Sequence, residues 1–207
     1  MSKKEVTATQ AGTVILGNEL SVNRLGYGAM RLTGPGIWGP PKDRKAALAI
    51  LRRAVELGIN FIDTADSYGP HVSEELIAEA LHPYPADLVI ATKGGWERPG
   101  PNQWTHNATP DHLRKAVEGS LKRLRLERID VYQLHAPDNV VSFDVSIETL
   151  AELKREGKIR MVGLSNVTQE HIERARRIVP IVSVQNRYNI ADDLWRSQAS
   201  ATCVLLA

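Results

Sequence analysis

Polar side chains that could do chemistry occur at five corresponding points of the sequence, each at the end of a short apolar run. In order they are Asp63, Lys93, His135, the pair Ser165 and Asn166, and Gln185. A tyrosine, Tyr68, closely follows the first of them in the stretch FIDTADSYG. Carboxylate, ammonium, imidazole and phenol groups that lie close together can transfer protons and stabilise charge. These positions are therefore the candidate functional residues.

Tyr68 and Lys93 together indicate proton transfer to or from a carbonyl oxygen. A tyrosine with a pKa of about 10 is a poor proton donor or acceptor at neutral pH, and a nearby ammonium group lowers that pKa by favouring the phenolate. Asp63 would hold the amine in place and keep it charged, while His135 would donate a hydrogen bond to a bound carbonyl. Because no side chain supplies a hydride, a cofactor has to provide it. The alternative reading is an ordinary core tyrosine and a surface lysine.

The elements that must position these residues are short apolar strands that alternate with amphipathic helices. Helical periodicity and capping residues predict helices over 44–58, 73–82, 109–124, 144–156 and 168–178, the second opening at Ser73. The apolar runs predict strands over 24–30, 59–63, 88–92, 129–134, 159–164 and 181–185. A β-hairpin is expected around TVILGNELSV, where Gly17 and Asn18 provide the turn signal.

This alternation predicts an α/β protein of the TIM-type (β/α)8 barrel class. In such a barrel the carboxyl ends of all parallel strands meet at one face, where active sites form. The five polar positions would then converge on one pocket. A complete barrel typically needs about 250 residues, so we expect residues 1–207 to form a single, incomplete domain. About six βα units would be present and the last two missing, with 190–207 as a divergent tail.

Composition favours a small-molecule enzyme over a nucleic-acid or membrane protein. The 26 basic and 24 acidic residues leave a formal charge of only +2, which predicts no attraction to nucleic acid. No run of about 18 apolar residues is present, so no membrane span is expected. The single cysteine and the polar first residues favour the cytoplasm. The histidines at 71, 82, 106 and 112 form no close ligand pair, so no metal is expected. The oligomeric state stays open.

Five motifs taken together resemble those of the aldo-keto reductases. They are FIDTADSYG, the lysine after VIAT, the LH of YQLHAPD, GLSN and VQNRYN, and the resemblance extends over about residues 14–189. The stretches NRLGYGAMRLTGPGIWGPP and YGPHVSEE also look like the bacterial pyridoxal reductase branch of that family. The resemblance implies a (β/α)8 barrel that reduces an aldehyde or ketone with NADPH, with pyridoxal as a candidate substrate.

The same resemblance implies a role for each candidate residue. Tyr68 would be the proton donor, Lys93 and Asp63 would tune it, and His135 would orient the substrate carbonyl. The nicotinamide carboxamide, which needs both hydrogen-bond donors and acceptors, would be bound by Ser165, Asn166 and Gln185.

Two alternatives to this interpretation remain open. An incomplete barrel could instead be a remnant that binds a nucleotide or a partner without turnover. Trp96 and Trp104, in the loop GGWERPGPNQW, could line a substrate pocket or simply cover the barrel mouth. The glycines at 26 and 28 do not form a dinucleotide fingerprint, because Arg31 occupies the third glycine position.

Overall fold

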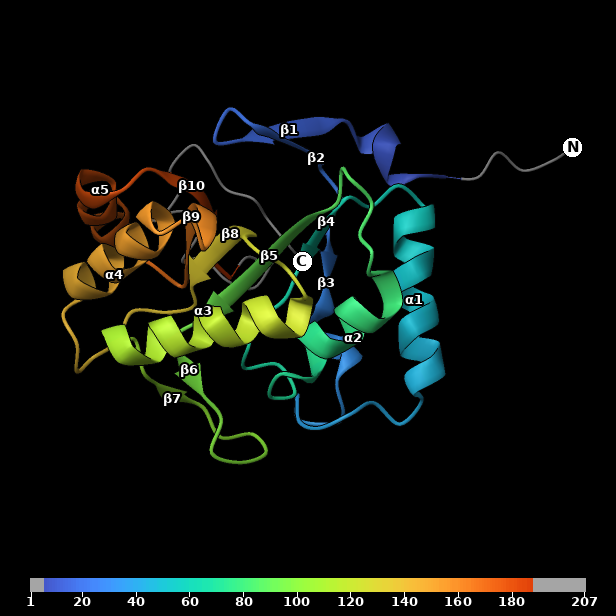
Figure 1. Ribbon diagram of the computed structural model, residues 1–207, viewed down its shortest axis with the longest axis horizontal. Coiled ribbons are helices and arrows are strands. Elements are labelled where there is room, and N and C mark those ends of the chain that lie inside the picture. Colours follow the sequence, from blue (N-terminus) through green and yellow to red (C-terminus); the bar gives the residue numbers. More distant parts are fainter. Residues whose placement is uncertain (1–5, 188–207) are drawn as a thin grey trace, which may run out of the picture.

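The computed structural model describes residues 6–187 (Figure 1). Its centre is a six-stranded parallel sheet, and all six strands predicted from the sequence are present. The strands are β3 (Tyr27–Gly28), β4 (Phe61–Asp63), β5 (Val89–Gly94), β8 (Ile129–Leu134), β9 (Ile159–Ser165) and β10 (Ile181–Gln185). The expected tail at 190–207 lies outside the described residues.

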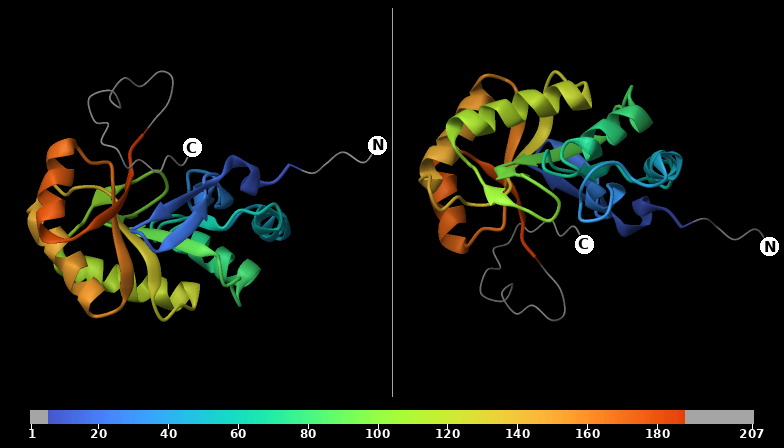
Figure 2. Two further views of the ribbon diagram at one scale, coloured as in Figure 1. Left: turned by 90° about the horizontal axis from the view of Figure 1, so that it is seen from above. Right: turned by 90° about the horizontal axis from the view of Figure 1, so that it is seen from below.

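The strands of this sheet lie side by side in sequence order. The order is β10-β9-β8-β5-β4-β3, and every neighbouring pair is parallel. The sheet curls, and the helices lie along the outside of the curve (Figure 2). A curved parallel sheet with one helix between successive strands is the arrangement of a TIM-type α/β fold, which agrees with the predicted fold class.

Five α-helices connect the strands, close to the ranges that the sequence predicts. They are α1 (Arg44–Glu56), α2 (Val72–Leu81), α3 (Pro110–Leu124), α4 (Phe143–Arg155) and α5 (Gln169–Ile178). Thr109 caps α3 by accepting a hydrogen bond from the backbone of His112, and Thr168 caps α5 in the same way. The start of α2 was predicted one residue late. His71, with a φ of 74°, precedes this helix, and Ser73 lies inside it.

Two small antiparallel ribbons lie at opposite ends of the sheet (Figure 1). The predicted hairpin is present as β1 (Thr13–Leu16) and β2 (Leu20–Asn23). The second ribbon consists of β6 (Trp96–Glu97) and β7 (Thr105–His106), and it follows the carboxyl end of β5. Two short 3-10 turns, η1 (Ala8–Ala11) and η2 (Ala29–Leu32), complete the described elements.

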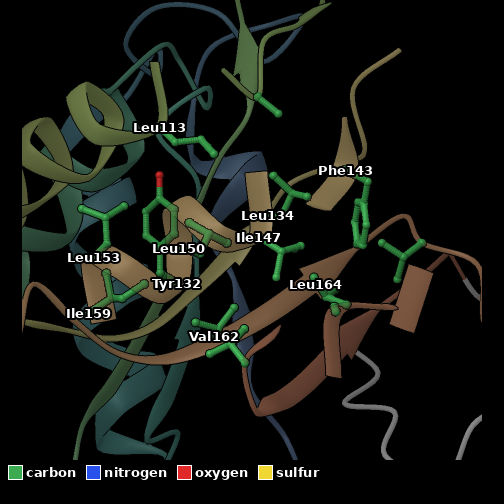
Figure 3. Packing of buried hydrophobic residues seen from close by; sticks show 14 of the residues in the cluster. Leu113, Tyr132, Leu134, Phe143, Ile147, Leu150, Leu153, Ile159, Val162 and Leu164 are labelled. Carbon is green, nitrogen blue, oxygen red and sulfur yellow. The ribbon is translucent and has the colours of Figure 1, made fainter. Parts of the chain in front are cut away.

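Apolar side chains fill both faces of the sheet, as expected for parallel strands that helices cover. On the outside, β8, β9 and β10 pack against α3, α4 and α5, with residues such as Tyr132, Leu150 and Leu164 fully buried (Figure 3). A second outer cluster joins β4 and β5 to α1 and α2. On the inside, the hairpin packs against Phe61, Met161 and other strand residues. No helix within residues 6–187 is long and apolar enough to cross a membrane.

Candidate active site

The strand register explains why the polar residues meet. Side chains alternate between the two faces of a strand, so in β5 the apolar Val89 and Ala91 and then Lys93 all point to the inside of the curved sheet. The same phase brings Asp63 of β4 after Phe61, which lies in the inner apolar cluster. In β9 and β10 it brings Ser165 opposite Gln185. The apolar residues fill the interior toward the amino ends of the strands, and the polar residues lie at the carboxyl ends.

Lys93 and Asp63 form a buried ion pair. Lys93 Nζ donates to Asp63 Oδ2 at 2.7 Å and to the backbone oxygen of Thr64 at 2.8 Å. The lysine is only 1% exposed, which rules out the alternative of a surface lysine. Burial alone lowers the pKa of Lys93, but the carboxylate of Asp63 and the hydroxyl of Tyr68 outweigh that effect and raise the pKa above its usual value. The amine therefore stays an ammonium group at neutral pH.

Tyr68 lies beside this ammonium group, in the loop between β4 and α2. Lys93 Nζ is 5.2 Å from the centre of the Tyr68 ring. Burial raises the pKa of the Tyr68 phenol, and the charge of Lys93 opposes that rise without cancelling it. The net shift is upward, so the phenol keeps its proton at neutral pH.

The turn after Tyr68 requires glycine. Gly69 has a φ of 100°, in the region that side chains disfavour, and a Cβ there would lie 2.5 Å from the Cβ of Val72. The glycine lets the chain turn sharply into α2 while the ring of Tyr68 remains near Lys93. The sequence SYG thus fixes both the loop and the tyrosine.

His135 lies against Tyr68 at the same end of the sheet. Their ring centres are 5.7 Å apart in an edge-to-face arrangement. Burial, together with the charge of Lys93, lowers the pKa of His135 well below its usual value, so the imidazole is neutral. Its Nδ1 lies 3.4 Å from the Ser67 hydroxyl. If that hydroxyl donates to Nδ1, the ring proton is on Nε2 and can be donated to a ligand.

The three predicted cofactor residues border the same pocket. This pocket of about 440 Å³ is lined by Asp63, Tyr68, His135, Ser165, Asn166 and Gln185, together with Gly28, Met30, Arg31, Asn186 and Arg187. Asn166 Nδ2 donates to the backbone oxygen of His135 at 3.0 Å and to Ser165 Oγ at 3.2 Å. Within residues 6–187 the Asn166 side-chain oxygen and the whole Gln185 amide have no hydrogen-bond partner. They are available to a ligand.

Asp66 is separate from this group, although it lies in the same loop. It is 4% exposed, and its Oδ1 has no hydrogen-bond partner within the described residues. Burial and the nearby charge of Glu74 raise the pKa of this carboxyl well above its usual value. His71, not Asp66, precedes α2. Asp66 is therefore a loop residue that does not cap the helix.

Sequence reasoning missed several residues around the pocket. Ser67, whose hydroxyl faces His135, lies within the FIDTADSYG motif but was assigned no role from the sequence. Arg98, which binds the loop of Tyr68, belongs to no recognised motif. Trp96 contacts the ring of His135 edge-on at 6.2 Å between centres, and Trp104 packs on Trp96. Neither tryptophan lines the 440 Å³ pocket itself. Among residues 6–187, no three His, Cys, Asp or Glu side chains are grouped to hold a metal ion.

Known proteins resemble the chain over most of its length. Residues 24–205 match the model of the aldo/keto reductase family. An uncharacterized oxidoreductase of Schizosaccharomyces pombe is 52% identical over 187 residues, which are 90% of this chain and 60% of that protein. Pyridoxine 4-dehydrogenase of Escherichia coli is 47% identical over 188 residues, which are 87% of this chain and 65% of that enzyme.

A solved structure of the same family also resembles this chain. It is an aldo/keto reductase from Klebsiella pneumoniae in complex with NADP and acetate, with a TM-score of 0.72 at 25% identity over 89% of this chain and 61% of that one. The chain spans 60% and 65% of the length of the two curated relatives. The parallel sheet gathers Tyr68, Lys93, Asp63 and His135 at one end, which agrees with the family match and with these relatives. The chain belongs to the aldo/keto reductase family.

Proposed function

We propose that this chain carries the reacting groups of an NADPH-dependent reductase, which converts an aldehyde or ketone to an alcohol. One observation carries the proposal: a buried tyrosine and a buried histidine border one pocket, beside a buried ion pair of Lys93 and Asp63. Reduction of a carbonyl needs a proton for the oxygen as well as a hydride for the carbon. Tyr68 can supply that proton, and His135 can bind the same oxygen.

In the proposed reaction Tyr68 is the general acid. Because burial raises its pKa, the phenol carries its proton at neutral pH, as reduction requires. As the carbonyl oxygen gains negative charge, the Tyr68 proton moves to it and the tyrosine becomes a phenolate. The Lys93 ammonium stabilises that phenolate, and Asp63 holds Lys93 in place. In the reverse direction the phenolate is the general base.

His135 orients the substrate. Its neutral imidazole can donate one hydrogen bond to the carbonyl oxygen, while Ser67 faces the other ring nitrogen. Two donors, Tyr68 and His135, would then meet at the oxygen that becomes negatively charged. Such preorganised donors lower the barrier to reaction because they need no rearrangement as charge develops.

The side chains at the ends of β9 and β10 fit a nicotinamide cofactor. A carboxamide has an acceptor oxygen and a donor NH2 group, and Ser165, Asn166 and Gln185 offer a hydroxyl and two amides around one pocket. The free Asn166 oxygen and Gln185 amide leave capacity for these bonds. When bound, dihydronicotinamide supplies the hydride that no side chain can provide. We choose NADPH because the sequence motifs resemble those of NADPH-dependent enzymes.

We propose pyridoxal as a substrate, supported by the 47% identity to the Escherichia coli pyridoxine 4-dehydrogenase. The finer features of the fold belong to the same proposal. The six parallel strands would be the first six of an eight-stranded barrel, in a cytoplasmic enzyme that acts on small carbonyl compounds.

The test is carbonyl-dependent oxidation of NADPH by the purified chain. With pyridoxal, the Tyr68→Phe variant should lose about a hundredfold or more of kcat, because its ring packs the same but has no proton to give. Tyr27→Phe is the matched control, since Tyr27 is partly buried on β3 but does not line the pocket. Equal activity of Tyr68→Phe and the parent would refute the mechanism.

A second candidate function is nucleotide binding without turnover, supported by the hydroxyl and amide groups of Ser165, Asn166 and Gln185 around one pocket. Titration of the chain with NADPH, followed by nucleotide fluorescence, distinguishes the two. Binding without carbonyl-dependent NADPH oxidation would favour this second candidate, and turnover would exclude it.

A further inference from the structure

Arg98 makes an unusual set of contacts directly behind the catalytic tyrosine. It follows β6, and the residue is 9% exposed. Its Nε donates to the backbone oxygen of Gln103 at 2.9 Å, and its Nη2 donates to that of Gly36 at 3.1 Å. Its Nη1 donates to two more backbone oxygens, those of Ile37 at 2.9 Å and Ser67 at 3.1 Å. One guanidinium group thus binds four carbonyls.

These carbonyls come from three separate loops. Gly36 and Ile37 lie between β3 and α1, Ser67 lies between β4 and α2, and Gln103 lies between β6 and β7. The first two loops also bind each other, because Gly39 N donates to Gly69 O at 2.7 Å. Arg98 is the hydrogen-bond donor that the three segments share.

The contact with Ser67 connects Arg98 to both residues that are proposed to bind the carbonyl oxygen, Tyr68 and His135. The carbonyl that Arg98 binds belongs to the peptide that joins Ser67 to Tyr68. The hydroxyl of the same serine lies 3.4 Å from Nδ1 of His135. A shift of Ser67 would therefore displace Tyr68 along the chain and remove the partner of His135.

Arg98 also contacts the aromatic residues beside the pocket. Its guanidinium carbon lies 3.7 Å from the centre of the Trp104 ring and 5.5 Å from that of Trp38. Trp104 packs on Trp96, which contacts His135. Within residues 6–187 no carboxylate forms an ion pair with Arg98. Its charge is compensated by carbonyl dipoles and aromatic faces, which a planar, forked donor matches better than the point charge of a lysine.

We propose that Arg98 is a positioning residue, which holds three loops together and so fixes Tyr68 and His135 relative to each other. The proposal rests on the proposed function of Tyr68, because Arg98 does not line the pocket and acts through the Ser67–Tyr68 peptide. Its contacts predict that loss of the guanidinium loosens residues 36–39 and 67–69 and lowers kcat more than it changes KM.

The first experiment is independent of activity. Hydrogen exchange of the full chain, followed by mass spectrometry, is compared for the parent, Arg98→Ala and Arg98→Lys. Exchange should be faster in segments 36–39 and 67–69, whose amides include Gly39 and Gly69, and unchanged in α4 and β8. Unchanged exchange in the two segments, or an equal increase throughout the chain, would overturn the proposal. Arg98→Lys keeps the positive charge, and it replaces Arg98→Ala in the exchange experiment if that variant does not fold.

The second experiment measures NADPH-dependent reduction of pyridoxal and its rescue by a free cation. Arg98→Ala should lose between about tenfold and a hundredfold of kcat, the range expected when a catalytic group is slightly misplaced. Low-millimolar guanidinium chloride should restore part of it, and methylammonium chloride should not. Rescue by neither salt, or by both equally, would contradict the proposed positioning role of Arg98.

The matched control is Arg114→Ala. Arg114 binds Glu152 and Glu156 between α3 and α4, away from the pocket, so kcat should stay at the parent level and guanidinium should have no effect. If the parent chain itself reduces no carbonyl, the proposed function fails, and the exchange experiment alone decides the role of Arg98.

Discussion

Tyr68 and His135 respond in opposite directions to the same burial. Burial disfavours the charged form of any group, so it raises the pKa of a phenol and lowers that of an imidazole. Both shifts occur here, and both groups are neutral at pH 7. The sequence predicts the effect of Lys93 on Tyr68 from residue types alone. It does not predict that burial outweighs that effect, because burial depends on residues from several strands and loops.

At Asp66, burial creates a charge-dependent cost to stability. The carboxyl has a raised pKa in the folded chain, caused first by burial and then by Glu74. A group whose folded pKa lies above its unfolded value, about 3.9 for aspartate, stabilises the fold fully below that unfolded value. Its contribution is lost as the pH rises through the folded pKa.

We therefore predict that Asp66→Asn becomes progressively more stable than the parent as the pH rises. Thermal melts at about pH 4 should give similar Tm values, because the aspartate is then largely protonated, and melts at about pH 8 should favour the variant. Asp87→Asn, at an exposed loop position, is the control and should show no such trend. A constant difference between Asp66→Asn and the parent at every pH would contradict this account.

At the level of elements, the repeating pattern made the strands and most helix ends predictable. The cap of α3 followed from Thr109 and Pro110, since both have strong local preferences at helix starts. The start of α2 did not follow from Ser73, because that side chain points inward. It accepts from Thr64 Oγ1 at 2.8 Å and donates to Ala29 O at 3.3 Å. The Ser73 hydroxyl makes tertiary hydrogen bonds and is therefore not available to cap the helix.

Three elements behind the pocket are joined by one buried carboxylate, Glu74 of α2. Thr92 of β5 donates to its Oε1, and Arg123 of α3 donates to its Oε2, both at 2.6 Å. The Glu74 side chain is fully buried and that of Arg123 is 17% exposed. Removing one partner of a buried pair leaves the other without compensation, which costs more than the pair itself contributes.

Glu74→Gln should therefore destabilise the chain by about 3 kcal/mol, because Arg123 loses its carboxylate. The double variant Glu74→Gln with Arg123→Met should lose less free energy of unfolding than the sum of the losses in the two single variants. Urea denaturation of the four proteins gives this coupling directly. Glu79→Gln, which breaks the exposed pair with Arg44, should make no resolvable difference. Additive effects of Glu74 and Arg123 would show that the two are not coupled.

At the scale of the whole molecule, the curl of the sheet brings together residues that are far apart in the sequence. Residues from Asp63 to Gln185 meet because every strand points the same way and the order is sequential. The βα alternation was enough to predict that convergence. It could not predict Arg98, since its partners at Gly36, Ser67 and Gln103 are backbone carbonyls. Any residue type offers such an acceptor, so the sequence holds no signal for it.

The end of the sheet opposite the pocket is covered by the hairpin, and this cover should contribute strongly to stability. Leu16 is 1% exposed and belongs to a cluster with Phe61, Val89, Met161 and Val182, which come from four strands. Ile15, the preceding residue of β1, is 63% exposed. The two residues differ in the face of β1 that they occupy, although both are apolar and of equal size.

Leu16→Ala should lower the free energy of unfolding by about 2–5 kcal/mol, through lost burial and the cavity left among the four strands. Ile15→Ala should change it by less than about 0.5 kcal/mol, because its side chain already contacts water. Urea denaturation of both variants measures the difference. If the two substitutions cost the same, the hairpin does not cover the interior of the sheet in solution. A large loss for Leu16→Ala alone would establish that the first strands of the chain hold together the distant strands that carry the pocket.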